Sequence, residues 1–218
     1  MDNRINNSIT TGILWKEMLL FCIPIMIGTL FQQLYNAVDV IVVGKFVSTT
    51  ALACVGGSSG MMINLFVGFF VGMTSGVTVV IAKKFGAQDY TSLQEALHTS
   101  IALSIMGGIV FSFLGILFAP SMLKLLGTPI DLMEGSLLYL RIYFFGLTFT
   151  FLFNTGSAIL RALGDSKRPL YYLMICCIVN IILDILFVVV FKFGIAGVAI
   201  ATSVAQACSA FLVLSTLT

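Results

Sequence analysis

The amino-acid sequence predicts an all-α, polytopic membrane protein with six transmembrane helices. Composition is the first reason: 59% of the 218 residues are apolar and 9% are charged, whereas soluble domains are about 45–50% apolar and about 25% charged. The second reason is six apolar segments, each longer than the roughly 20 residues that cross a hydrocarbon core. These observations exclude a soluble enzyme and a disordered chain. A net charge of +2 is too small for a nucleic-acid-binding protein.

The six segments lie near residues 17–43, 52–82, 95–119, 137–160, 170–191 and 195–217. They lack the strict alternation of barrel strands, so each is predicted to be a helix. A polar stretch from Pro120 to Glu134 separates the third segment from the fourth, and residues 191–194 form a tight turn before the sixth. Short loops make successive helices antiparallel. Residues 1–16 precede the first helix, so residues 17–218 make up one six-helix unit.

The distribution of Lys and Arg predicts the orientation in the membrane. One side collects seven of them (Arg4, Lys16, Lys83, Lys84, Arg161, Lys167 and Arg168), and the other collects four (Lys45, Lys124, Arg141 and Lys192). The side richer in Lys and Arg is normally cytoplasmic. We therefore expect a multi-pass protein of the cell (cytoplasmic or inner) membrane, with both termini and the segment 1–16 in the cytoplasm.

The five cysteines all lie within apolar segments: Cys22, Cys54, Cys176, Cys177 and Cys208. Their odd number and their positions favour free, buried thiols over a disulfide framework. The sequence has no Cys/His spacing typical of a metal site, and we expect no organic cofactor.

Three glycines of the second segment, Gly68, Gly72 and Gly76, are spaced by four residues. This spacing places them on one helix face, where a neighbouring helix can approach closely. We expect this face to be a packing contact. A sliding surface used during conformational change is the alternative.

Two carboxylates lie inside predicted spans, where an ionisable group costs about 2.5–3.5 kcal/mol on insertion scales and indicates function. The first is Asp39, which shares a helix face with Gln32 and Asn36 at i, i+4 and i+7. Pro24 lies in the same segment and removes one backbone hydrogen bond, so it is a candidate hinge. The alternatives are a structural kink with a cluster of interhelical hydrogen bonds, or a partly solvated Asp39.

The second carboxylate is Asp184, stacked on Asn180 at i, i+4 in the fifth segment. The pair offers oxygen ligands to a small cation such as Na⁺, or a carboxyl group that binds and releases a proton. The sixth segment adds Thr202 and Gln206, and the fourth adds Asn154. Gln32, Asn36, Asn154 and Gln206 are candidates to line a cavity, and ordinary interhelical hydrogen bonding is the alternative. No metal is predicted beyond Na⁺ at this site.

With these residues in place, the chain resembles the amino-terminal half of the MATE family (multidrug and toxic compound extrusion). The stretches that carry the resemblance run along nearly the whole chain: QQLYNAVD at 32–39 followed by VG at 43–44, FGA at 85–87, YLRI at 139–142, LRALGDSK at 160–167, NIILD at 180–184 and GIAGVAIAT at 194–202. Each is weak alone, but all occur in order and at spacings similar to those of the family.

The resemblance implies a secondary antiporter that exports drugs and other organic cations in exchange for Na⁺ or H⁺. It also implies a fold of two six-helix lobes around a central cavity, with the coupling site in the amino-terminal lobe. The family's site residues map onto Asp39, Asn180, Asp184 and Thr202, with Asn154 as a weaker match. We expect alternating access, in which a cation or proton neutralises the Asp39/Asp184 cluster and the first helix bends at Pro24.

Other functions stay open on the sequence alone. A flippase that moves a lipid-linked or other amphipathic cargo could use the same fold, and so could a non-transporting membrane assembly subunit. An enzyme is not expected, because neither Asp39 nor Asp184 lies in a Tyr-Asp or Gly-x-Gly-Asp pattern. The expected partners are the lipid bilayer, a small-molecule organic cation or amphipathic substrate, and a second lobe that six spans leave no room for. We expect that lobe later in a longer parent chain or, less simply, from a second copy.

Overall fold

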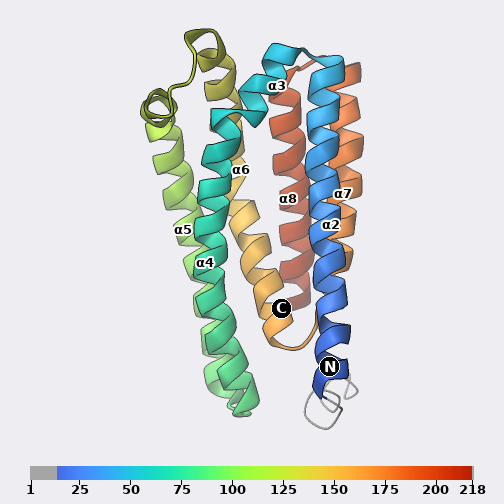
Figure 1. Ribbon diagram of the computed structural model, residues 1–218. Coiled ribbons are helices and arrows are strands. Elements are labelled where there is room, and N and C mark those ends of the chain that lie inside the picture. Colours follow the sequence, from blue (N-terminus) through green and yellow to red (C-terminus); the bar gives the residue numbers. More distant parts are fainter. Residues whose placement is uncertain (1–13, 218) are drawn as a thin grey trace.

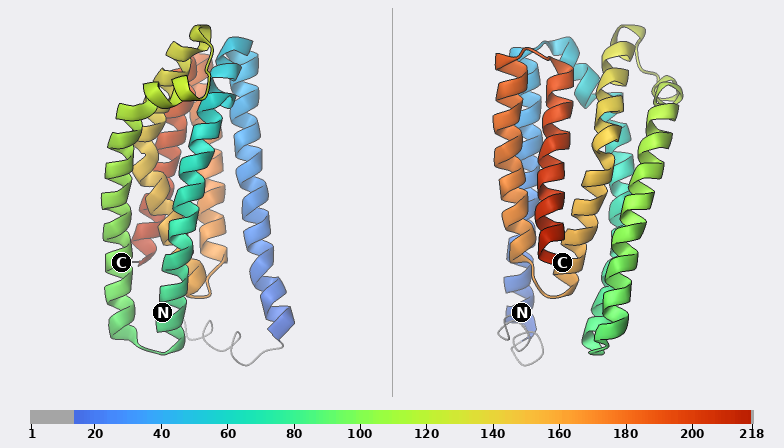
Figure 2. Two further views of the ribbon diagram at one scale, coloured as in Figure 1. Left: turned by 60° about the vertical axis from the view of Figure 1, so that its left-hand side comes forward. Right: turned by 180° about the vertical axis from the view of Figure 1, so that it is seen from behind.

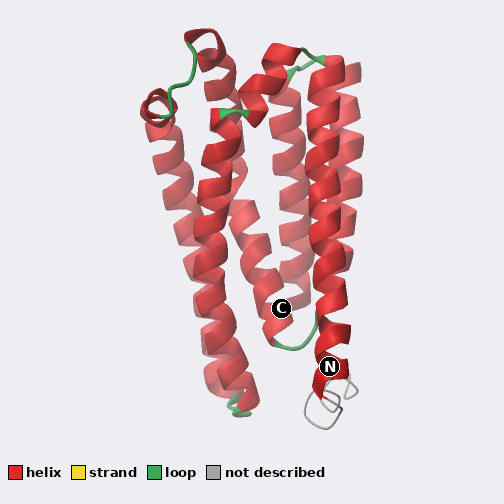
Figure 3. Ribbon diagram, viewed as in Figure 1, coloured by secondary structure: helices red, strands yellow, loops and turns green. Residues whose placement is uncertain are grey.

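The computed structural model describes residues 14–217, and this part of the chain consists of helices joined by short loops and contains no strand (Figure 3). The helices are α2 (Leu14–Phe46), α3 (Thr49–Gly56), α4 (Ser58–Gly86), α5 (Tyr90–Leu125), α6 (Ile130–Ala162), α7 (Lys167–Asp184), the π-helical segment η1 (Ile185–Val190) and α8 (Ile195–Leu217). The prediction of an all-α fold is confirmed. Arg4, Thr218 and most of the predicted segment 1–16 lie outside the described residues.

Six stretches of the described chain are long and apolar enough to cross a membrane, as predicted. They run over Phe21–Phe46, Thr49–Gly86, Tyr90–Leu125, Ile130–Ala162, Lys167–Val190 and Ile195–Leu217. Many large apolar side chains are exposed on their outer faces, for example Leu34, Leu65 and Phe113. A bilayer provides the apolar surroundings that such faces require.

The second span differs from the prediction because it is broken near its start into α3 and α4. A side chain at Gly57 would place its Cβ 2.6 Å from the carbonyl oxygen of Ala53, so only glycine fits at this junction. The Ser48 side chain accepts a hydrogen bond from the amide of Ala51 and caps α3. The result is a short helix that joins α2 to the long helix α4 at one end of the bundle (Figure 1).

The third span also runs further than predicted. Pro120 was expected to lie after this helix, but α5 continues through it to Leu125. The helix stops one turn later, where Gly127 adopts a φ of +69° and Thr128 donates its amide to the carbonyl of Leu123. This is the hydrogen-bond pattern of a glycine-terminated helix end. The glycine, and not the proline, therefore sets the boundary.

The fifth span changes its winding directly after Asp184, where α7 becomes η1. Short π-helical segments are rare and are often found at functional sites. The chain then reverses within residues 191–194, as predicted, with φ angles of +57° at Lys192 and +59° at Gly194. Asp184 thus sits at the junction of two helix types, one short helical segment before a tight reversal.

The two inner helices of the bundle are α6 and α8. In their most apolar windows 61% and 56% of residues are buried, against 28% or less in the other spans. Helix α2 packs mainly on α7, and α4 packs mainly on α6 (Figures 1 and 2). Both marked chain ends lie at the end of the bundle opposite α3, as an even number of spans requires (Figure 1).

The face of α4 that carries Gly68, Gly72 and Gly76 does not pack on another helix within residues 14–217. A Cβ added at any of the three would meet no atom within 4 Å. Close helix packing falls elsewhere: Gly108 lies against Thr148 of α6, and Gly146 lies against Ser203 of α8. The expected packing contact at the three glycines is therefore wrong for this part of the chain.

Candidate functional site

Four polar side chains from three helices lie in the interior of the bundle. Asp39 comes from α2, Asn180 and Asp184 from the end of α7, and Thr202 from α8. Their exposed fractions are 7%, 0%, 0% and 3%. Asp39 interacts with both Asp184 and Asn180. The structure thus brings together the two carboxylates that the sequence singles out, although 145 residues separate them (184 minus 39).

Most polar atoms of this cluster lack a hydrogen-bond partner among the described residues. They are one oxygen of Asp39, both oxygens of Asp184 and both amide atoms of Asn180. Thr202 is partnered, since its hydroxyl donates to the carbonyl of Val198 at 3.0 Å, but its oxygen keeps lone pairs that can accept or coordinate. Buried polar groups are normally satisfied, so a concentration of unpartnered atoms in one place is typical of a ligand-binding site.

The chemistry of the donor set narrows the choice of ligand. Within residues 14–217 no three His, Cys, Asp or Glu side chains come together as they would around a transition metal. Two carboxylates, an amide oxygen and a hydroxyl are hard oxygen ligands that suit a small cation. The same carboxyl groups can share a proton instead, because two like charges at short range in a buried site are unfavourable. The site therefore fits either Na⁺ or a shared proton, the two ions that the sequence leaves open.

Three tyrosines surround the carboxylates, and the sequence did not lead us to expect them there. Tyr35 interacts with Asp39 and places its hydroxyl beside Thr202. Tyr139 interacts with both carboxylates, and Tyr143 interacts with Asp39 and with Thr150. The rings of Tyr139 and Tyr143 are 6.3 Å apart. The sequence does contain a pattern that places them on common helix faces. Tyr35 lies one turn before Asp39, and Tyr139 and Tyr143 are four residues apart on the fourth span.

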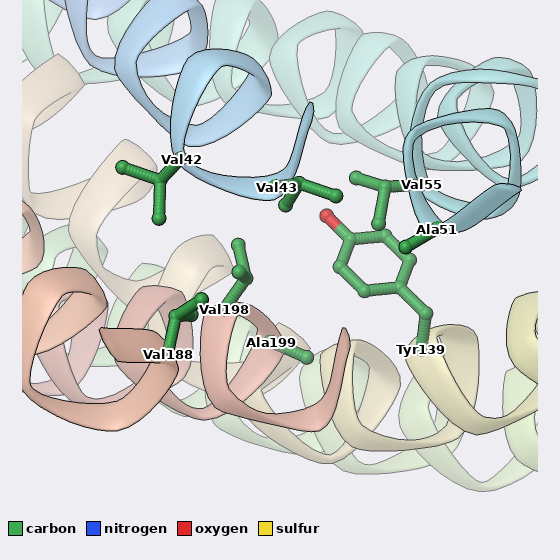
Figure 4. Close-up of a cluster of buried hydrophobic side chains, with 8 residues drawn as sticks. All are labelled: Val42, Val43, Ala51, Val55, Tyr139, Val188, Val198 and Ala199. Carbon is green, nitrogen blue, oxygen red and sulfur yellow. The ribbon is translucent and has the colours of Figure 1, made fainter. Parts of the chain in front are cut away.

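A cluster of apolar side chains, drawn in Figure 4, lies one helical turn from the site toward the end of the bundle nearest α3. Val43 follows Asp39 by one turn of α2, Val188 follows Asp184 by one turn, and Val198 precedes Thr202 by one turn. Because α8 runs antiparallel to α2 and η1, each of these valines lies one turn closer to the α3 end of the bundle than its polar neighbour. Figure 4 shows the ring of Tyr139 within this cluster, with its hydroxyl directed toward Val43.

The four candidate cavity-lining residues have different positions. Gln32 and Asn36 are exposed on α2. Asn154 donates from its side chain to the carbonyl of Thr150 at 2.8 Å. Gln206 is buried, and its side-chain oxygen has no partner within residues 14–217. The structure therefore does not gather these four into the carboxylate cluster.

Pro24 lies inside α2, four turns before Asp39, and is buried. Gln32 and Asn154 line a small cavity together with Pro24. All five cysteines are free, as predicted, but Cys22 is exposed and not buried. Its position on the outer face of α2 is compatible with a free thiol in contact with lipid.

Comparisons with known proteins agree with this architecture. The profile of the MatE family matches residues 24–186. The chain is 32% identical over 204 residues to the probable multidrug resistance protein YoeA of Bacillus subtilis, covering 92% of this chain and 44% of that protein. A second probable multidrug resistance protein of the same organism, YpnP, is also 32% identical, over 197 residues, covering 90% of this chain and 44% of that protein. The chain therefore spans somewhat less than half the length of these curated relatives.

Solved structures give the same result. A MATE crystal structure in the bent conformation superposes with a TM-score of 0.85 at 27% identity, covering 93% of this chain and 45% of that one. A MOP superfamily transporter from Pyrococcus furiosus superposes with a TM-score of 0.86, also at 27% identity, over 93% of this chain and 44% of that one. The six-helix bundle described above therefore corresponds to about half of each of these proteins.

Proposed function

This chain belongs to the MATE family, and from that premise we propose that it forms the ion-coupling lobe of an antiporter that exports drugs and other organic cations. Family membership confirms the expectation of a multi-pass membrane protein, and it supports a transporter over an enzyme. The export of particular compounds, the coupling ion and the mechanism are our proposals. They rest on the carboxylate cluster and on the multidrug resistance and export proteins among the relatives.

The buried pair of Asp39 and Asp184 is the observation that supports the proposal most directly. Buried oxygens without a partner are unfavourable, and a bound Na⁺ or a shared proton would remove that penalty. The ion then stabilises whichever arrangement of α2, α7 and α8 brings the ligands together. An ion that binds one arrangement more tightly than another shifts the equilibrium between them, which is the requirement for coupling.

We propose that α2 is the element that moves. It carries Asp39 at one end and Pro24 further back, and the proline removes a backbone hydrogen bond and permits a bend. Solved MATE structures have been described in bent and in straight conformations, which supports two arrangements of this kind. Ion binding at Asp39 would favour one of them, and release of the ion would restore the other.

Transport by alternating access also needs a wall opposite this bundle. Gln32 and Asn36 are exposed near the middle of the first span, where lipid is a poor environment for amide groups. We propose that a second six-helix lobe faces α2 and α4 across a cavity into which these amides project. The half-length match to the relatives supports this arrangement.

A second cargo class has its own support. The MOP superfamily transporter from Pyrococcus furiosus is described as having a binding pocket of reversed polarity, which suggests a different function for that protein. A flippase-type activity toward a lipid-linked or other amphipathic cargo is therefore the second candidate. The exposed side chains on α2 that would meet a cargo are neutral amides, which favour a cationic or neutral cargo over a strongly anionic one.

The experiment that tests the first proposal compares carboxylate variants in two assays. In the first, the purified chain is titrated with Na⁺, and with acid, while bound ions and released protons are measured. Asp39→Asn and Asp184→Asn should each abolish ion binding, and the exposed Asp131→Asn should bind like the wild type. In the second, vesicles that contain both lobes should lose ion-driven dye export in the same two variants. Normal ion binding by both variants would refute the coupling site, whereas normal dye export alone would refute the ion-coupled mechanism.

A further inference from the structure

The small cavity lined by Pro24, Gln32 and Asn154 lies away from the carboxylate cluster. It has a volume of about 100 Å³, is partly open, and is lined by α2, by the last turns of α6 and by the start of α7. Since a water molecule occupies about 30 Å³ of liquid, this space would hold about three waters or one tetrahedral oxyanion. The connection between α6 and α7 lies at the same end of the bundle as both marked chain ends (Figure 1).

The cationic group of this cavity is Arg161, which lines it from the last turn of α6. Its guanidinium forms no ion pair and no side-chain hydrogen bond with any of residues 14–217. A guanidinium is always charged and presents five N–H donors in a planar fork that matches phosphate oxygens. A half-buried arginine with none of these donors used within the described chain has capacity for an anion.

Asp165, four residues after Arg161 in the sequence, does not supply that anion. Asp165 accepts the backbone amides of Lys167 and Arg168 at 3.1 Å each and caps the first turn of α7. It also forms an ion pair with the side chain of Arg168 at 3.1 Å. Since Asp165 is fully engaged by its own loop, the segment keeps an excess of two positive charges: three cations, Arg161, Lys167 and Arg168, against one carboxylate.

Two hydroxyl groups complete the cavity. Ser157 lies one turn before Arg161 on α6 and is 2% exposed. Its Oγ has no hydrogen-bond partner within the described chain. Ser166 is buried at the start of α7, and its side chain makes no capping hydrogen bond. Both line the cavity beside the amino-terminal end of α7, whose first two amides are already bound by Asp165.

From this arrangement we infer that the cavity binds a phosphate-bearing anion, held by Arg161 and by the hydroxyls of Ser157 and Ser166. The position at a helix end and the surplus of positive charge suit the head group of an anionic phospholipid, which basic segments attract at a membrane surface. Free inorganic phosphate offers the same chemistry. Pro24 and Gly28 line the other wall of the cavity, so a bound anion lies against the segment of α2 where a bend is available.

The test uses the purified chain and two probes. Native mass spectrometry measures retention of phosphatidylglycerol against phosphatidylcholine, and thermal unfolding measures protection by inorganic phosphate. We expect phosphatidylglycerol to bind the wild type selectively and to bind Arg161→Gln at least about tenfold more weakly, because charge-assisted hydrogen bonds are lost. Arg168→Gln is the matched control: it removes the same charge from the same loop but from an exposed, already paired side chain.

Two further variants keep the test informative if Arg161→Gln fails to fold. Ser157→Ala removes only the buried hydroxyl and should weaken binding by a few-fold, and Arg161→Lys keeps the charge but loses the fork geometry. Phosphate protection that depends on Arg161 without lipid selectivity would identify a soluble phosphate as the ligand and support the site. Equal effects of Arg161→Gln and Arg168→Gln on both probes would overturn it. Neither assay depends on transport, so the outcome is independent of the proposed antiport.

Discussion

Replacement of Asp184 by leucine tests whether the carboxylate cluster is built for ion binding at the expense of stability. Both oxygens of Asp184 are buried without a hydrogen-bond partner in residues 14–217, and the side chain is 0% exposed. Leucine has a similar length and no polar atoms. If no ion is bound, the substitution removes two unsatisfied atoms and the electrostatic repulsion with Asp39.

The expected magnitude follows from these two atoms. A buried, unsatisfied polar atom costs about 1–3 kcal/mol. Taking the low end for each oxygen, Asp184→Leu should stabilise the ion-free chain by about 2 kcal/mol. For a chain of about 200 residues, each kcal/mol raises the melting temperature by about 2–4 °C. The wild type should in turn be stabilised by its coupling ion, and the variant should not.

Thermal unfolding followed by circular dichroism, with and without Na⁺ and at two pH values, measures both effects. Asp131→Asn is the control, since that carboxylate is exposed: its removal should leave the response to Na⁺ and to pH unchanged and should lower the stability by no more than about 1 kcal/mol, the value of an acidic side chain in the first turn of a helix. The reasoning is refuted if Asp184→Leu is less stable than the ion-free wild type by more than about 1 kcal/mol, the typical net value of one hydrogen bond. Such a loss would mean that Asp184 has a structural role, because breaking a satisfied buried pair typically costs about 3–5 kcal/mol.

Three further predictions concern Tyr139, two glycines and Asp89. Tyr139→Phe removes a hydroxyl within electrostatic range of both carboxylates and should weaken ion binding by up to about tenfold in a titration of the purified chain, without loss of the helical fold. Gly108→Leu should prevent folding, because even a Cβ at this position would lie 2.8 Å from backbone of α6, whereas Gly72→Leu should be tolerated in the same expression and melting assays. Asp89 caps α5, and the hydrogen bonds that its carboxylate accepts from Ser92 hold the pKa of Asp89 below the ordinary 3.8. The stabilisation by the Asp89 carboxylate is therefore present above pH 3.8 and is lost as the pH falls through the lowered pKa. Asp89→Ala should accordingly flatten the acid limb of a plot of melting temperature against pH.

The fold was predictable because the bilayer restricts the choices. Six apolar segments of sufficient length can satisfy their backbone groups only as helices, so the composition and the spacing of polar stretches decide the architecture. The boundaries were less predictable because they depend on single glycines. Gly57 breaks the second span and Gly127 ends the third, whereas Pro120, the stronger signal in the sequence, lies inside α5. A proline removes one hydrogen bond, but the surrounding helix can compensate.

The carboxylate site was predictable for a different reason. A charged side chain inside a span is unfavourable enough to indicate a function, and an amide one turn away identifies the helix face on which that side chain lies. Asp39, Asn180, Asp184 and Thr202 were therefore visible in the sequence. The tyrosines were not, because an aromatic residue in an apolar span is normally part of the core. Only the three-dimensional packing of α6 shows that Tyr139 lies within electrostatic range of the carboxylates.

Gln32, Asn36 and Asp39 show where helical periodicity stops being informative. Their spacing places all three on one face of α2, yet Asp39 is 7% exposed and the other two are exposed. The difference arises along the helix axis: near Asp39 the face meets η1, α8 and the apolar cluster, while further back α2 lies mainly against α7. Periodicity predicts which residues share a face but not what covers that face at each height. Amides left exposed at mid-membrane need water or protein beside them, since lipid cannot pair with them. This requirement is the strongest physical reason to expect a polar cavity in front of α2.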